Sequence, residues 1–151
     1  GPRARVSNTW VRRDAAQGET RTHGFFFRPT SPGGAGVLGL PVRTRGRPGR
    51  HLTRGSAEVT YLRVSDGLRF TPLGALRARA GRIRDRCRCS CVDWYGNARP
   101  IFIRGRMFAL LGYELVEGEL VGEGLRERDR VRFLWPRPAA WQARSSAAPG
   151  G

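Results

Sequence analysis

Short runs that alternate between apolar and polar residues recur along the chain and predict β-strands. Residues 57–64, Ala-Glu-Val-Thr-Tyr-Leu-Arg-Val, are rich in β-formers and end at the turn sequence Ser65-Asp66-Gly67. Residues 81–95 alternate most regularly, with arginine at the even positions from 82 to 88 and isoleucine, aspartate and three cysteines at the odd positions from 83 to 91. Residues 130–135 form a further candidate strand. We therefore expect a fold dominated by strands.

Other segments carry weaker patterns. Phe25-Phe26-Phe27 is a compact apolar run that is followed by Pro29. A turn at residues 95–98 leads into Ile101-Phe102-Ile103, which we expect near a sheet edge because Pro100 lacks an N–H group. Residues 107–121 are ambiguous, since 107–111 fit a helix as well as a strand and Glu117-Gly118 resembles a hairpin turn.

One short helix is expected over residues 71–81. Thr71 is a suitable N-cap, Pro72 suits the first helical position, and Gly81 suits the C-terminal end. Leucine and alanine occupy most of the positions between them.

These elements predict a mainly β chain with five to seven short strands, one short helix and basic flexible arms. This description fits a small barrel or sandwich of the SH3-like or OB-like type, between which strand counting does not choose. We expect a basic N-terminal segment at 1–24, a mainly β domain at 25–137, and a disordered tail at 138–151. Within that domain, residues 28–56 are predicted to form a Gly/Pro/Arg-rich loop or arm.

The composition shows that the chain is strongly basic. The 151 residues include 28 basic and 12 acidic side chains, giving a formal net charge of +16, and every basic residue is arginine. Without lysine, the chain has neither a P-loop phosphate-binding lysine nor a Schiff-base amine. The excess charge lies before residue 114, which predicts a polyanionic partner there and leaves the C-terminal third for a protein partner.

The sequence also bears on location. No apolar run approaches the roughly 18 residues of a membrane span, and no secretory h-region is visible at the N-terminus. The three closely spaced cysteines do not have the spacing of a disulfide-stabilised extracellular domain. We expect an intracellular protein without a membrane partner, nuclear if its source is eukaryotic or viral, with a role in transcription or chromatin regulation.

Arg45-Gly46-Arg47-Pro48 is the sharpest local motif. It resembles the core of the AT-hook, in which an extended Arg-Gly-Arg-Pro segment lies in the narrow minor groove of A·T-rich DNA. The resemblance covers four residues and implies minor-groove binding, with Arg43, Arg50 and Arg54 as flanking cations. Narrow grooves concentrate negative potential, which attracts arginine, while proline keeps the chain extended.

A second candidate for nucleic-acid binding is the row Arg82, Arg84, Arg86 and Arg88. Alternate side chains on one face of a strand lie about 6.8 Å apart, close to the spacing of successive phosphates. The alternation recurs at Arg126, Arg128, Arg130 and Arg132, with Glu127 and Asp129 expected on the opposite face. For either row, a solvent-exposed face of an amphipathic strand is the competing interpretation.

The cysteines and histidines give little support for a metal site or a catalytic site. Cys87, Cys89 and Cys91 invite a zinc site completed by His51, but sulfurs at every second position of a strand lie too far apart to share one metal unless a bulge intervenes. We expect no bound metal and no cofactor. His23 and His51 are the only imidazoles, and neither is paired with a nucleophile in the sequence.

The leading hypothesis is a nucleic-acid-binding module that is not an enzyme. Duplex DNA would be bound by the arm around residues 43–54 and by the strand arginines. The first alternative is a binder of RNA or single strands that stacks bases on Trp94 and Tyr95. The second is a chromatin or peptide-interaction module with an aromatic pocket. Oligomeric state and sequence preference stay open.

Overall fold

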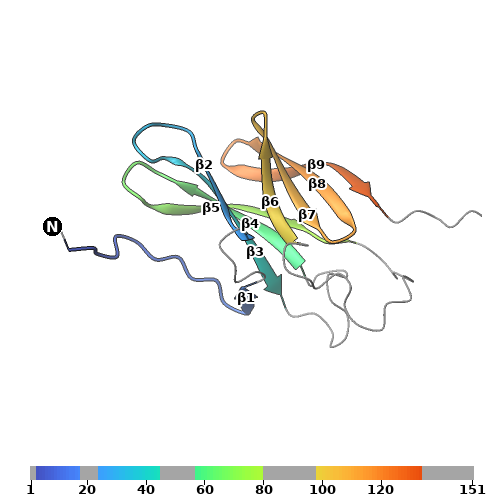
Figure 1. Ribbon diagram of the computed structural model, residues 1–151, viewed down its shortest axis with the longest axis horizontal. Coiled ribbons are helices and arrows are strands. Elements are labelled where there is room, and N and C mark those ends of the chain that lie inside the picture. The colour runs from blue at the N-terminus through green and yellow to red at the C-terminus, as the bar shows by residue number, and fades with distance from the viewer. Residues whose placement is uncertain (1–2, 18–23, 45–56, 80–97, 134–151) are drawn as a thin grey trace, which may run out of the picture.

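Two antiparallel sheets make up the described part of the chain. The computed structural model describes residues 3–17, 24–44, 57–79 and 98–133 (Figure 1). The first sheet contains β1 (Ala15–Gln17), β2 (Phe26–Pro29), β3 (Gly36–Thr44), β4 (Ala57–Val64) and β5 (Phe70–Arg77), and the second contains β6 (Ala98–Ile103), β7 (Arg106–Leu111), β8 (Glu114–Val121) and β9 (Gly124–Arg132). The mainly β prediction is confirmed. Over these residues the strands do not close into a barrel.

The second sheet is an up-and-down meander, in which each strand pairs with the next one along the chain, and so is the part of the first sheet that runs from β2 to β5. The first has the order β1-β3-β4-β5, with β2 pairing β3 beside β1, and the second has the order β6-β7-β8-β9. Contacts join the turns at one end of the two sheets. Ser31 donates to Asp66 at 3.0 Å, Arg28 donates to the Gly105 carbonyl at 2.8 Å, and Arg63 lies 3.1 Å from Glu123.

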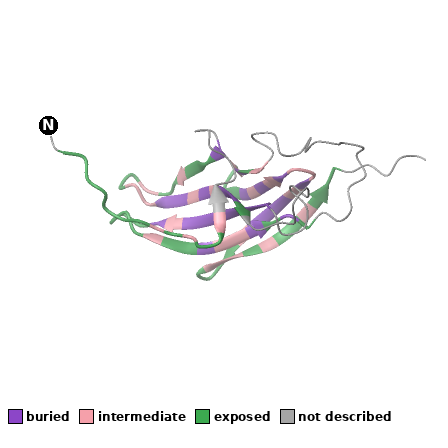
Figure 2. Cartoon of the chain, turned by 90° about the horizontal axis from the view of Figure 1, so that it is seen from below, coloured by how far each residue is buried: buried purple, intermediate pink, exposed green. Residues whose placement is uncertain are grey.

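The core lies between the sheets and is built from alternate residues of facing strands (Figure 2). Its buried members are Val37, Ala57, Val59, Tyr61, Leu73, Leu76, Ala78, Met107, Ala109, Leu111 and Val116. The Tyr61 hydroxyl donates to the Phe108 carbonyl at 2.6 Å, so this hydroxyl is satisfied inside the core. Burial raises the pKa of Tyr61 far above its ordinary value.

The helix predicted at 71–81 is wrong over the described residues, because Phe70–Arg77 forms strand β5. A register shift opposite Tyr61 and Leu62 inserts Leu73 as an extra residue. The buried side chains of β5 therefore do not follow the strand period of two throughout. Leu73 and Leu76 are three positions apart, and Leu76 and Ala78 are two apart. This mixed spacing resembles the spacing of buried residues on a helix. Pro72 is tolerated because β5 is an edge strand of its sheet.

The loop predicted at 28–56 is wrong for residues 28–29, which end strand β2, and for residues 36–44, which form the long strand β3. β3 lies inside its sheet, with β4 on one side and β1 and β2 in turn on the other. The strand was not predicted because Pro41 and three glycines nearby have low β-propensity. In the folded chain, tertiary packing overrides that low propensity. Residues 45–56 lie outside the described part.

In the second sheet, residues 107–111 form strand β7 rather than a helix. The hairpin turn expected at Glu117-Gly118 is also wrong, since both residues lie within β8. A register shift between them makes this point irregular, and the chain reverses instead after Val121. The predictions of a strand at 57–64 and of an edge position for Pro100 are confirmed.

Candidate nucleic-acid interface

Arg43 is the one predicted binding residue that the structure describes. It is exposed near the end of β3, where its backbone pairs with Ala57 and with Ala16. The other residues of the AT-hook-like arm (Arg45, Gly46, Arg47, Pro48, Arg50 and Arg54) and of the arginine row (Arg82, Arg84, Arg86 and Arg88) lie outside the described residues, as do the cysteines, the histidines, Trp94 and Tyr95.

The strand ends that flank the two arginine-rich segments nevertheless lie together. Residues 45–56 connect the end of β3 to the start of β4, and these two strands pair along their length. Residues 80–97 begin after Arg79, next to the Ala78 amide that donates to the Ala57 carbonyl at 3.0 Å. They end at Ala98, which packs against the same core cluster as Ala57. Both segments thus begin and end at the side of the sheets opposite the turns that join β2 to β3, β4 to β5, β6 to β7 and β8 to β9.

The second arginine row, on β9, does not form the continuous face that its alternation predicts. Gly118 pairs with Glu127 and Glu117 pairs with Asp129, so Arg128 is an extra residue in β9. The shift brings Glu127 and Arg130 to the same side, where the Arg130 Nε donates to Glu127 at 3.0 Å. The expectation that Glu127 lies opposite all four arginines is therefore wrong.

Each arginine of that row is instead paired with a carboxylate of its own chain. The pairs are Arg126 with Glu119 at 2.6 Å, Arg128 with Glu117 at 3.5 Å, Arg130 with Glu114 at 2.5 Å and with Glu127 at 2.9 Å, and Arg132 with Glu114 at 3.1 Å. Internal pairing offsets much of this positive charge, which makes β9 a poor phosphate-tracking surface.

Glu114 is completely buried and is held by three donors from two sheets. Arg130 and Arg132 of β9 donate to its carboxylate, as does the backbone amide of Arg79, which follows β5, at 2.7 Å. Arg130 also donates to the Arg77 carbonyl at 2.9 Å. This cluster ties the end of β5 to the second sheet. Sequence reasoning missed it because the partners lie far apart along the chain.

Glu58 is a second buried carboxylate, on the outer face of the first sheet. Arg77 of the neighbouring strand donates to it at 2.8 Å, and Arg12 forms a close ion pair with its other oxygen. Arg12 also donates to Thr60 at 2.7 Å. The segment before β1, which we expected to be a basic arm, is therefore attached to the sheet through Arg12.

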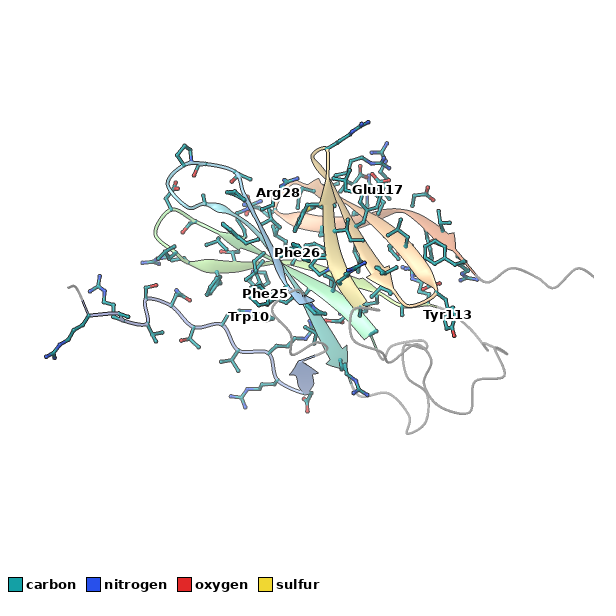
Figure 3. The ribbon with its side chains drawn as sticks, in the orientation of Figure 1. Trp10, Phe25, Phe26, Arg28, Tyr113 and Glu117 are labelled. Atoms are coloured by element: carbon teal, nitrogen blue, oxygen red, sulfur yellow. The ribbon has the colours of Figure 1, made fainter. Side chains whose placement is uncertain are left out.

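Glu117 is the third such carboxylate, and Figure 3 labels it on the second sheet. Arg106 donates to both of its oxygens, at 2.8 and 2.5 Å, and the Arg106 guanidinium lies 4.8 Å from the centre of the Phe108 ring. The hydrogen bonds from Arg106 hold the pKa of Glu117 below its usual value, and those from Arg130 do the same to the pKa of Glu127.

Positive charge without an acidic partner remains elsewhere. Within the described ranges, no carboxylate lies within ion-pair distance of Arg3, Arg5 and Arg13 before β1, of Arg69 and Arg104 in hairpin turns, or of Arg99 on β6. The uncompensated charge of the described residues is therefore spread over the segment before β1, two turns and one sheet edge.

No cluster of histidine, cysteine or acidic side chains suited to a metal ion occurs among the residues that the structure describes. The same residues contain no helix that is long and apolar enough to cross a membrane. Comparison with known proteins adds no relative: no protein-family model matches the chain, and no curated protein or solved structure is significantly similar to it.

Proposed function

We propose that the chain is a nucleic-acid-binding module, not an enzyme, that takes duplex DNA at the end of its two sheets opposite the hairpin turns. In this proposal the two facing sheets form a small sandwich, and the arm with Arg45 and Arg47 lies in the minor groove. Arg82, Arg84, Arg86 and Arg88 contact phosphates.

The grouping of the strand ends that flank residues 45–56 and 80–97 carries the proposal. These segments hold eight arginines and two aspartates, so a large excess of positive charge is attached at one side of a compact fold. The exposed Arg43 lies at the same side. A concentrated positive charge attracts a polyanion far more strongly than the same charge spread evenly.

The internal pairing on β9 supports the same proposal by removing a competing surface. Arg126, Arg128, Arg130 and Arg132 are already paired with carboxylates, so a phosphate bound there would have to compete with an existing partner. Arg126 accordingly provides a control position, because it is exposed and paired with Glu119.

Fluorescence anisotropy with A·T-rich and G·C-rich duplexes at one fixed salt concentration tests the proposal. We expect Arg47→Ala to weaken binding to the A·T-rich duplex more than to the G·C-rich duplex, because only the former has the narrow groove. Arg86→Ala should weaken both duplexes equally, as the loss of a phosphate contact does. Arg126→Ala should change neither duplex by more than about twofold, since Glu119 already neutralises that charge.

Equal losses for all three variants would show that only overall charge matters and would contradict the proposed site. Loss of binding in Arg86→Ala alone, with tighter binding to single strands or RNA than to duplex DNA, would favour the single-strand alternative.

A further inference from the structure

The outer face of the second sheet is an ordered grid of side chains that the proposed function does not use. One row across the four strands is Arg99, Leu110, Leu115 and Val131, and the next is Ile101, Phe108, Glu117 and Asp129. Neighbouring positions, such as Ala109 and Val116, point the other way into the core. All eight side chains of these two rows therefore lie on the face of the second sheet that points away from the first sheet.

This face is unusually apolar for an outer face. Val131 is 53% exposed and Ile103, at the end of β6, is 55% exposed. Ile101, Phe108, Leu110 and Leu115 lie between them and are partly exposed. Outward-facing positions of a solvated antiparallel sheet are normally polar, and contiguous exposed apolar patches mark interaction surfaces.

The charged groups in the middle of the face form a pair that another surface can cover. Arg106 binds Glu117 through two hydrogen bonds, and its guanidinium lies against the Phe108 ring. Arg106 and Glu117 thus already have each other as partners before another surface covers them.

Two charged residues at opposite edges of the face form no ion pair among the described residues, and Asp129 attracts the Arg106 guanidinium only from a longer distance. Arg99, on the edge strand β6, has no carboxylate partner among the described residues, and Asp129, on the edge strand β9, forms no ion pair there. The only hydrogen bond that the Asp129 side chain accepts in those ranges comes from the backbone amide of Arg130, at 2.7 Å. A cation and an anion are therefore separated by the width of one sheet.

We propose that this face is a symmetric interface with a second copy of the chain. A twofold axis parallel to the strands at the middle of the face places β6 of one copy over β9 of the other. The apolar rows then cover each other, and Arg99 of each copy comes within reach of Asp129 of the other. The face carries its own charge complementarity, which any other occupant would have to supply.

The size of the face sets the expected strength of the dimer. Four strands about 4.8 Å apart, with six residues rising about 3.4 Å each, give a face of about 400 Å². Stable interfaces bury about 800 Å² per partner, so we expect a reversible dimer with a dissociation constant in the micromolar range.

Sedimentation equilibrium of the full chain without nucleic acid tests this interface separately from DNA binding. Wild type should show a monomer–dimer equilibrium. Arg99→Asp and Asp129→Arg should each weaken the dimer about tenfold or more, because each places like charges opposite one another twice. The double variant Arg99→Asp/Asp129→Arg should return to within about threefold of wild type, since the pair is restored in reverse.

Arg69→Asp is the matched control, because it makes the same charge change in an exposed turn of the first sheet. Circular dichroism checks that each variant keeps its fold, which exposed substitutions should leave intact. A wild-type chain that stays monomeric up to millimolar concentration overturns the proposal. So does a double variant that fails to regain the dimer, or an Arg69→Asp variant that weakens it as much as Arg99→Asp.

Discussion

Gly39 of β3 lies directly against Pro100 of β6. The two sheets contact each other at this point because Gly39 has no side chain. A Cβ atom added at Gly39 would lie 2.4 Å from the Pro100 Cβ and 2.7 Å from its Cγ. The proline ring is rigid and buried and cannot move away. Glycine at this position therefore permits the close approach of the two sheets.

Gly39→Ala should destabilise the fold by about 1–3 kcal/mol, the usual cost of forcing extra volume into a packed interior. Urea denaturation followed by tryptophan fluorescence measures the change. Gly67→Ala is the control, because a Cβ there would lie no closer than 3.8 Å to the Ser65 hydroxyl, and its effect should stay within about 0.5 kcal/mol. Equal effects of the two variants would contradict the close contact.

Glu114→Gln should be among the most destabilising single changes in the chain. It removes one of the two carboxylates that pair with Arg130, whose side chain is only 10% exposed, and leaves Glu127 as the remaining partner. Loss of a buried charged hydrogen-bond partner costs about 1.5–3 kcal/mol. Glu119→Gln removes the exposed partner of Arg126 and should cost less than about 1 kcal/mol. Denaturation midpoints of both variants at neutral pH provide the comparison.

Stability should fall in acid because folding lowers the pKa of Glu117 and of Glu127. A lowered pKa contributes stability above the ordinary value of 4.5, and that contribution is lost as the pH falls from there through the folded-state pKa. Free energies of unfolding measured from pH 7 to pH 3 should show this loss. Glu117→Gln should make the pH dependence shallower. A variant with the same pH dependence as wild type would show that Glu117 makes no such contribution.

Local patterns were sufficient to predict the strand at 57–64, because its β-formers are continuous and its turn residues follow at once. They failed at residues 71–81, where a bulge at Leu73 changes the spacing of buried side chains from that of a strand to that of a helix. They also failed at residues 36–44, where Gly39 serves a sheet contact that the sequence alone does not reveal.

The charged sites show a related limit. Alternation correctly places residues 126–132 in a strand, but their arginines pair with three carboxylates of β8 and with Glu127 of β9, and a register shift decides which side each side chain takes. Sequence distance conceals such pairing. The carboxylates Glu58, Glu114 and Glu117 gave no signal of burial, although an acid next to strand-forming apolar residues in an arginine-rich chain is the pattern to examine in similar sequences.

The salt dependence of duplex binding tests the central claim most directly. Titration of wild-type protein with an A·T-rich duplex at several salt concentrations should give a log-log slope that corresponds to at least about five phosphate contacts, since each contact releases counterions. The eight arginines of residues 45–56 and 80–97 are enough to supply that number. An affinity that does not change between low and moderate salt, or no detectable binding at low salt, would contradict the account.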